Sequence, residues 1–379
     1  MTPRILFVSS NIHTPWGGSE VLWYKTACSL LRHNRAQVGV TSPDWGFTPR
    51  HIGEIIAAGG TRFEHPKDPG RPLQFVISRL KGSPAYRRKR ILQRFRPSLI
   101  VHSMGKSYEG IEWMQLAHQS NIAYVNLVQL SSELQWPEDH EVDAYRAGYQ
   151  QARANCFVSE SNKELVSKQL GIVIPRSQIV RNPILVPIEA LPFPAITPDY
   201  HFALPATLVP IHKGQDTLFE ILAQQRWQKR PIQFNLYGKG VFGKSLDNYR
   251  NYLGLDNIHF KGHSSDIREI WRTNHLLVMG SRMEGLPLSL VEAMSCGRPA
   301  VVPDIAGMSE VLEDNKSGFL APSPSYRDLD QTLERAWQAR HEWEQMGKIG
   351  AESIRNKIPF EPAEWFGDYL LNQLDSNQS

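Results

Sequence analysis

Two glutamates separated by seven residues are the first candidates for chemistry in this chain. Glu284 and Glu292 lie in the stretch "SRMEGLPLSLVEAMSCGRPAVV", which follows the short apolar run "HLLVMGS". Proline favours the first position of a helix and glycine the position past its end, so we predict a strand, a loop and a helix that starts at Pro287 and stops at Gly297. The unpaired amides and positive dipole of such a helix start would bind a diphosphate.

The two acids would lie on either side of that diphosphate. Glu292 is expected roughly 7.5 Å along the helix axis from its start, and Glu284 lies on the loop side. Carboxylates accept hydrogen bonds from hydroxyls, and a nucleotide sugar carries hydroxyls on its ribose and on its sugar. The spacing therefore indicates a nucleotide-sugar site. In the alternative interpretation, Glu292 caps a neighbouring backbone group and Glu284 is a solvated loop acid.

A complete glycine-rich motif offers a rival chemistry. Gly238, Gly240 and Gly243 form a G-x-G-x-x-G pattern directly after the strand-like run "QFNLY", which taken alone proposes a dinucleotide-binding dehydrogenase. That fingerprint also requires an acid at the end of the next strand, and here "NIHFKG" ends in Phe260 and Lys261. The dehydrogenase interpretation is therefore disfavoured.

Length and composition describe a chain of two globular domains. The 379 residues exceed the size at which one core stops growing, and the hydrophobic content of 41% allows a large core in each domain. The three scattered cysteines fit neither a disulfide framework nor a zinc site. No apolar run is long enough for a signal peptide or a membrane span. We expect a protein that binds no nucleic acid. Its expected location is the cytoplasm, including the inner face of the membrane.

Strand-like and helix-like patterns alternate along both halves of the chain, as in "RILFVSS", "EVLWYKTACSLLRH" and "AQVGVTS". Such alternation is typical of α/β folds with a doubly wound parallel sheet. The proline-rich stretch between the halves has no helical period and suits a linker. We predict an N-terminal domain over 1–187, a linker over 188–200, a C-terminal domain over 201–360, and a last helix over 361–379 that crosses back to the N-terminal domain.

A basic run extends from Arg79 to Arg96. It carries eight lysines or arginines and no acid, with Ile91, Leu92 and Phe95 among them. A segment of this kind suits an anionic membrane surface, with its cations at the head groups and its apolar residues at the boundary. The alternatives are contacts to nucleic-acid phosphates or a solvated helix face.

The segment "EGLPLSLVEAMSCGRPAVVPDIAGMSEVLEDNKSGFL" resembles the C-terminal signature of family 4 glycosyltransferases, which are retaining enzymes of GT-B fold. Further resemblances are the "HKGQD" segment, the second-strand turn "LYGKG", the run "CFVSESNKELVSKQLGI" followed by "RNP", and the glycine-rich first loop "PWGGSE". They follow the family order over most of the chain. The resemblance implies two Rossmann-like domains facing across a cleft, with the acceptor site in the first and the donor site in the second.

The resemblance also implies roles for individual residues. Glu292 would bind the ribose hydroxyls, Glu284 would bind the donor sugar together with the amides of Gly285 and Leu286, and Lys213 would neutralise the diphosphate leaving group. The helix start at Pro287 and Leu288 and the turn at Gly238 complete the expected donor site. In the first loop, Gly17 and Gly18 would let the backbone approach the donor phosphates or the acceptor closely, with a simple tight turn as the alternative. From its position at the end of the strand-like run "SLIVHSM", His102 is the candidate catalytic residue of the first domain, and a histidine of the core or surface is the alternative. No metal and no cofactor are expected, and a UDP-sugar is the first guess for the co-substrate.

Two departures from the family pattern leave questions open. An arginine usually precedes the lysine in a Gly-Arg-Leu step, and here the corresponding residues are Ala206, Thr207 and Leu208. Arg282, His212 or Lys239 would have to replace that charge. In addition, Gln129 stands where the family often has a histidine, so the acceptor side differs from the common pattern.

The reading favoured by the sequence is a transferase that moves a hexose from a nucleotide sugar to a saccharide or lipid-linked acceptor, in cell-surface polysaccharide or glycolipid assembly. A nucleotide-sugar epimerase of the same fold and a non-catalytic nucleotide-sugar-binding protein are the alternatives. The missing arginine motivates the last of these.

Overall fold

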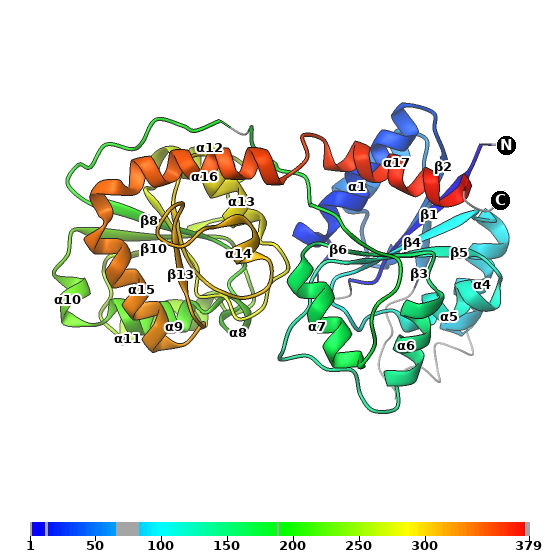
Figure 1. Ribbon diagram of the computed structural model, residues 1–379, viewed down its shortest axis with the longest axis horizontal. Coiled ribbons are helices and arrows are strands. Elements are labelled where there is room, and N and C mark those ends of the chain that lie inside the picture. Colours follow the sequence, from blue (N-terminus) through cyan, green and yellow to red (C-terminus); the bar gives the residue numbers. More distant parts are fainter. Residues whose placement is uncertain (1, 12–13, 66–82, 188, 376–379) are drawn as a thin grey trace. The chain divides into compact units, whose positions relative to one another are not determined.

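The chain folds into two compact units. The structure, a computed structural model, describes residues 2–11, 14–65, 83–187 and 189–375. The first unit comprises Met1–Pro183 together with Glu361–Ser379, and the second comprises Ile184–Phe360. The stretch expected to be a linker, 188–200, falls in the second unit in this division, and the C-terminal segment returns to the first (Figure 1).

The first unit is built on a parallel sheet with the strand order β3-β2-β1-β4-β5-β6-β7. Its central strands are continuous apolar runs because both faces of the sheet are covered, as is usual for parallel sheets. Its strands are β1 (Arg4–Ser9), β2 (Gln37–Pro43), β3 (Thr61–His65), β4 (Leu99–Met104), β5 (Ala123–Val128), β6 (Ala154–Phe157) and β7 (Ser177–Ile179).

Helices cover both faces of this sheet. Ile5 and Phe7 point into a core that includes Trp23, whereas Leu6 and Val8 point into a separate core that includes Phe95. The first core is closed by α1 (Val21–Arg32), α2 (Arg50–Ala57) and α17 (Pro362–Asp375). The second is closed by α4 (Pro84–Phe95), α5 (Ile111–Gln119), α6 (Val142–Gln151) and α7 (Glu160–Leu170).

The C-terminal helix α17 is an integral part of the first unit. Phe366 and Leu370 are fully buried in the same core as Leu30, and the hydroxyl of Thr26 donates to the carbonyl of Ala363 at 3.0 Å. Burial of two such side chains stabilises the docking of this helix by about 3 to 6 kcal/mol before the cost of ordering it. The sequence prediction of a last helix that crosses back is consistent with this packing.

The second unit has a parallel sheet with the order β10-β9-β8-β11-β12-β13 and a single continuous core. The strands are β8 (Tyr200–Pro205), β9 (Ile232–Tyr237), β10 (Ile258–Gly262), β11 (Leu276–Val278), β12 (Ala300–Pro303) and β13 (Phe319–Ala321). The helices are α8 (Pro210–Lys213), α9 (Gln215–Leu222), α10 (Gln225–Gln228), α11 (Gly243–Tyr252), α12 (Ile267–Thr273), α13 (Leu288–Ser295), α14 (Met308–Val311), α15 (Tyr326–Gln338) and α16 (Trp343–Lys357). Two short 3-10 helices, η1 (Gly18–Glu20) in the first unit and η2 (Arg340–Glu342) in the second, complete the elements among the described residues.

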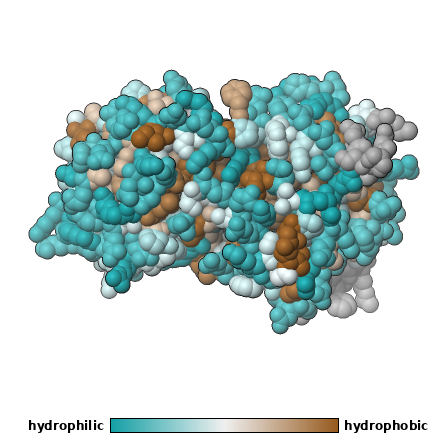
Figure 2. Space-filling view, viewed as in Figure 1, coloured by the Kyte–Doolittle hydropathy of each residue, from teal (hydrophilic) through white to brown (hydrophobic). Residues whose placement is uncertain are grey.

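The surface carries mostly hydrophilic residues on the face seen in Figure 2, with smaller hydrophobic areas between them. Within the described part of the chain, no helix is both long enough and apolar enough to cross a bilayer. The same residues contain no cluster of three or more potential metal ligands.

Candidate functional site

The residues expected to bind the donor lie on loops at one edge of the second sheet. In a parallel sheet the strands share one carboxyl edge, where ligands of open α/β folds bind. Lys213 ends helix α8 after β8, Gly238 directly follows β9, and Glu284 lies between β11 and α13. Strand β8 pairs with both β9 and β11, so the fold brings these three loops to adjacent positions.

Lys213 and Glu284 form an ion pair at this edge. The Lys213 Nζ lies 2.7 Å from Glu284 Oε1, and the two side chains are 21% and 7% exposed. A charge-assisted hydrogen bond at this distance and burial is stronger than a surface pair. The structure therefore brings two of the predicted site residues together, although 71 positions separate them in the sequence.

The backbone around this pair is locked by two glycines. Gly214 has φ +64°, and a Cβ added there would lie 1.9 Å from the carbonyl oxygen of Gly280. Only glycine allows so close a crossing of two chains. The amide of Arg282 also donates to the carbonyl of His212 at 2.8 Å, and the amide of Gly307 donates to Gly285 at 2.9 Å. The lysine and the glutamate thus extend from a fixed frame.

Helix α13 begins just after the predicted loop. The helix spans Leu288–Ser295, with Pro287 as the extended residue before it, so the predicted start was one residue early. Gly297 adopts a left-handed conformation with φ +74° past the helix end, as predicted. Glu292 lies inside the helix and is 4% exposed. Burial raises the pKa of its carboxyl to about 8, so the ligand-free protein holds it mainly protonated at neutral pH.

The arginine proposed as a replacement cation is already occupied. Arg282 donates from Nη1 and Nη2 to the two carboxylate oxygens of Asp216, both at 3.0 Å. It also donates to the carbonyl of Pro210 at 2.8 Å and to the hydroxyl of Thr217 at 2.7 Å. Its guanidinium therefore fixes the loop that carries Lys213 instead of facing a ligand.

Lys239 is differently placed. Its carbonyl accepts from the amide of Leu208 at 3.2 Å, so it lies beside the segment in which the family arginine is missing. Its side chain is exposed at the same edge. The ammonium group of that side chain makes no hydrogen bond or ion pair to the residues that the structure describes.

The glycine-rich motif is explained by packing of the backbone. A Cβ on Gly238 would lie 2.0 Å from the carbonyl oxygen of Ala206, and one on Gly240 would lie 2.4 Å from that of Leu208. These glycines let the loops after β8 and β9 touch. The motif therefore needs no dinucleotide to account for it, and it fixes the loop that bears Lys239.

In the first unit, His102 is buried below the carboxyl edge. It is 1% exposed, and its Nε2 lies 2.5 Å from the hydroxyl oxygen of Ser10. A Cβ on Gly110 would lie 2.5 Å from the same nitrogen. Burial lowers the pKa of the imidazole to about 3, so it is neutral at physiological pH. The contacts favour a role for His102 in positioning Ser10, and direct contact with a substrate stays a prediction.

The first loop ends in the predicted glycine pair. Gly17 is extended, with φ −166°, and a Cβ there would meet only Thr14 Cγ2 and Ser19 Oγ at ordinary distances of 3.7 and 3.8 Å. Gly18 starts η1. The fold itself does not require glycine at position 17, which is consistent with the predicted close approach of a ligand.

Two acids near this loop were not predicted from the sequence. Glu20 is 3% exposed and accepts from the indole Nε1 of Trp23 at 2.9 Å, and burial raises its pKa. Burial also raises the pKa of Glu109, on the loop after β4, to about 7. Both lie in segments that follow a strand, Glu20 in η1 after β1 and Glu109 in the loop after β4. This was the available signal, since parallel strands collect such segments at one edge.

Helix α4 contains most of the basic run, whose residues 79–82 lie outside the described part. The predicted role of its apolar residues was wrong, because Ile91, Leu92 and Phe95 are buried in the second core of the first unit. Arg88 is also held inside the unit, by an ion pair with Glu112 at 2.8 Å. The exposed cations are Lys89, Arg90, Arg94 and Arg96.

Comparison with known proteins agrees with this arrangement. The sequence model of the family glycosyl transferases group 1 matches residues 199–353, which lie within the second unit. An uncharacterized glycosyltransferase of Methanocaldococcus jannaschii is 29% identical over 139 residues, or 36% of this chain and 38% of the relative. The poly(ribitol-phosphate) α-N-acetylglucosaminyltransferase of Staphylococcus aureus is 30% identical over 119 residues, or 31% and 24%. The matches thus span less than half the length of these relatives.

Solved structures extend the likeness to nearly the whole chain. Anabaena HepE in complex with UDP-glucose has a TM-score of 0.74 at 18% identity, covering 97% of this chain and 99% of its own. Sucrose-phosphate synthase from Thermosynechococcus elongatus has a TM-score of 0.77 at 16% identity, covering 99% and 100%. At these identities the likeness shows the fold, which is the predicted GT-B fold with two parallel α/β sheets. The part of the chain that matches the glycosyl transferases group 1 family, residues 199–353, carries Lys213, Gly238, Glu284 and Glu292.

Proposed function

We propose that this protein is a glycosyltransferase that moves a sugar from a nucleotide-sugar donor to an acceptor with retention of anomeric configuration. The observation that carries the proposal is the Lys213–Glu284 pair at the carboxyl edge of the second sheet. Both residues lie in the segment that matches the glycosyl transferases group 1 family. A cation next to a carboxylate offers one group for a phosphate and one for a sugar hydroxyl. The proposal needs no metal, because Lys213 and the start of α13 supply the positive charge.

The donor site is proposed to lie in the second unit. Glu292 binds the ribose hydroxyls, and Glu284 binds the sugar together with the amides of Gly285 and Leu286. The unpaired amides at the start of α13, at Leu288, meet the diphosphate. When the donor enters, Lys213 exchanges its contact with Glu284 for the phosphate, which frees Glu284 to accept from the sugar.

Lys239 is proposed to supply the second cation that the Ala206-Thr207-Leu208 segment lacks. The backbone bond between Leu208 and Lys239 places it next to that segment. As the glycosidic bond breaks, negative charge grows on the leaving diphosphate, and a flexible ammonium can follow it. With Lys213 and Lys239 both next to the diphosphate, the two positive charges expected from the family are present. The missing arginine is then no reason to regard the protein as non-catalytic.

The acceptor site is proposed to lie in the first unit. Gly17, Gly18 and Ser10, which is bonded to His102, lie at or near its carboxyl edge and are suited to hydroxyl groups. The Staphylococcus aureus relative is named for transfer to poly(ribitol-phosphate), and this supports our proposal of a saccharide or lipid-linked acceptor. We still propose that the basic run contacts an anionic membrane, but through its exposed cations alone. We propose a cytoplasmic location, with the membrane inner face as the place of work if that contact forms.

A donor panel with product analysis tests the proposal. The full chain is incubated with the glucose conjugates of UDP, GDP and ADP, and thermal shift identifies the nucleotide that binds; UDP is expected, as in the HepE complex. Release of nucleotide with transfer of the sugar to an acceptor or to water supports a transferase. Interconversion of the free nucleotide sugar would indicate an epimerase, and binding without turnover would indicate a binding protein.

A further inference from the structure

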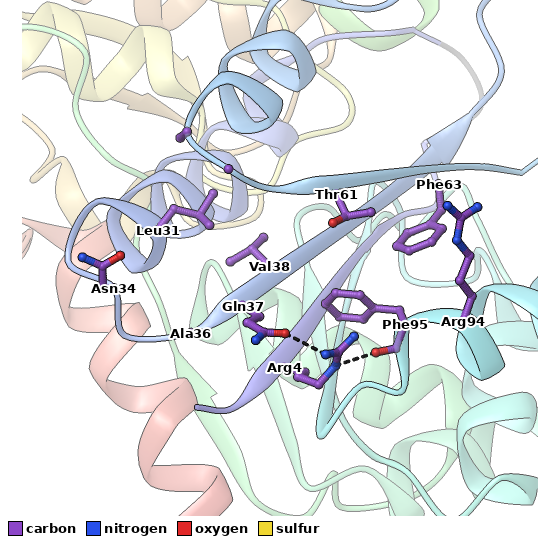
Figure 3. Close-up of a pocket in the computed structure, with 12 residues that line it drawn as sticks. Arg4, Leu31, Asn34, Ala36, Gln37, Val38, Thr61, Phe63, Arg94 and Phe95 are labelled. Atoms are coloured by element: carbon purple, nitrogen blue, oxygen red, sulfur yellow. Dashed lines mark hydrogen bonds between the residues drawn. The ribbon is translucent and has the colours of Figure 1, made fainter. Parts of the chain in front are cut away.

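A separate cavity lies in the first unit, away from the carboxyl edge. Its volume is about 420 Å³, within the range of small-molecule sites. Arg4, Gln37 and Thr61, the first residues of β1, β2 and β3, line it, so it lies at the amino edge of the sheet. Figure 3 shows these strand starts and the end of α4 around it.

The lining of this cavity is positively charged. Arg4 and Arg94 contribute two guanidinium groups, while Asn34, Gln37 and Thr61 contribute neutral polar groups. The described residues that line it include no aspartate or glutamate. Two unopposed positive charges next to apolar walls raise the local potential, which favours an anion.

Arg4 is fixed in place by its neighbours. Its Nε donates to the carbonyl of Phe95 at 2.6 Å, and its Nη1 donates to Gln37 Oε1 at 2.7 Å. Its guanidinium carbon lies 4.8 Å from the centre of the Phe95 ring. Since those contacts use Nε and Nη1, the Nη2 group remains as a donor in a defined direction.

Arg94 approaches from the other side of an aromatic pair. Its guanidinium carbon lies 5.8 Å from the centre of the Phe63 ring, and the Phe63 and Phe95 rings meet edge to face at 5.7 Å. Figure 3 shows the two rings between the two arginines. The cavity therefore combines two cations with an apolar surface formed by the aromatic pair.

Helix dipoles offer an explanation of these arginines that needs no ligand. Helices α1, α2 and α4 end near this edge, and cations stabilise helix C-termini. However, terminal carbonyls here already have partners: Leu30 accepts from Arg35, and Ile55 accepts from Gly60, both at 2.9 Å, and Phe95 accepts from Arg4. The side chain of Arg94 makes no hydrogen bond or ion pair to the described residues. Among those residues its guanidinium contacts the Phe63 ring, and no described acid neutralises its charge.

We infer that this cavity is a binding site for a phosphate ester with a small organic body. The Nη2 group of Arg4 would bind the phosphate oxygens, which suit its planar donors, and the phenylalanine rings would contact the body of the ligand. Arg94, on the far side of the ring pair, would add to the positive potential. The same chemistry occurs in soluble phosphorylated metabolites and in phospholipid head groups. The site is distinct from the proposed donor site, and its existence does not depend on the proposed activity.

The binding test uses the full chain saturated with UDP, so that the donor site takes no probe. Glycerol 3-phosphate is titrated by calorimetry as the soluble probe. Sedimentation with phosphatidylcholine vesicles, with and without phosphatidylglycerol, is the lipid arm. Binding in the first arm alone identifies a soluble ester as the source, and binding in the second alone identifies a head group. Absence of binding in both arms overturns the inference.

Matched variants decide whether the cavity is responsible. Arg94→Gln removes a lining charge, and Arg90→Gln removes the same charge from the same helix outside the cavity. Thr61→Glu places an acid in the lining, and Thr61→Gln is its neutral control. All three positions are exposed, so folding is not at risk. Thr61→Glu is expected to weaken binding by about tenfold or more, and Arg94→Gln by about threefold because it acts through the potential, with the controls near wild type. Equal losses in Arg94→Gln and Arg90→Gln, or in the two Thr61 variants, would show diffuse binding and reject the site.

Discussion

Lys213 and Glu284 form an ion pair at the carboxyl edge of the second sheet, with 2.7 Å between Nζ and Oε1. Strand pairing produces this contact, because β8 and β11 are neighbours and each leads into one of the two loops. The pair holds a lysine and a largely buried glutamate in direct contact. In the proposed donor site, a donor phosphate would compete with Glu284 for the lysine.

Replacing Lys213 by alanine is expected to lower kcat by about a hundredfold and to raise KM much less. The reason is that the charge it meets grows mainly in the transition state. Steady-state kinetics with the donor found by thermal shift measures both constants. Lys229→Ala, at an exposed lysine on the opposite edge of the sheet, is the control. A KM effect larger than the kcat effect would assign Lys213 to ground-state binding instead.

Glu284→Gln should reduce discrimination between donor sugars without lowering nucleotide affinity, because it also weakens the contact that competes with the phosphate for Lys213. The amide keeps the shape of the side chain but is a weaker acceptor for sugar hydroxyls. Competition between UDP and several UDP-sugars, measured as dissociation constants, checks this expectation. If UDP itself lost as much affinity as the UDP-sugars, Glu284 would have no sugar-specific role.

The pKa of Glu292 predicts a pH dependence of donor binding. Burial raises this pKa to about 8, whereas ribose hydroxyls donate best to an ionised carboxylate. Affinity should therefore increase as pH rises from about 6.5 to 8.5, with release of a proton on binding. A nucleotide sugar is the better ligand for calorimetry, since UDP has a terminal phosphate that also titrates. Glu292→Gln should bind more weakly, and its affinity should be flat over this range.

The sequence predicted the site loops well but not their contacts. The spacing of glycine, proline and glutamate around α13 predicted the loop before this helix and the end of the helix, because these signals are local. The contact of Lys213 with Glu284, and that of Arg282 with Asp216, depend on strand order, which spacing does not contain. The prediction for the apolar residues of the basic run was wrong for another reason. An amphipathic helix has the same period whether its apolar face meets a membrane or a core, and Ile91, Leu92 and Phe95 meet the core.

Lys239→Gln is expected to reduce kcat by about tenfold or more, since it would remove one of two charges that stabilise the leaving group. A second substitution, Thr207→Arg, returns a charge to the segment where the family has one and should recover part of the loss. Lys244→Gln, at an exposed lysine of α11, is the matched control. The assignment fails if Lys239→Gln keeps wild-type kcat, or if Lys244→Gln is equally impaired.

Burial of His102 predicts a loss of stability in acid. The folded state holds this imidazole neutral, with its pKa lowered to about 3 from the ordinary value of 6.5. Between these values the unfolded chain binds a proton that the folded chain does not, so stability is unaffected above pH 6.5 and falls as pH decreases below it. The slope from one such group is about 1.4 kcal/mol per pH unit. Chemical unfolding of the full chain between pH 5 and 7, followed by a probe in the first unit such as Trp113, should show this decline. His102→Gln will cost stability at every pH, because the contact with Ser10 is altered, but its stability should fall less steeply with acid by one proton. The exposed His118→Gln serves as the control and should keep the wild-type slope. An unchanged slope in His102→Gln would mean that the imidazole is protonated in the folded protein, and its bond to Ser10 would then have to be donated from the ring.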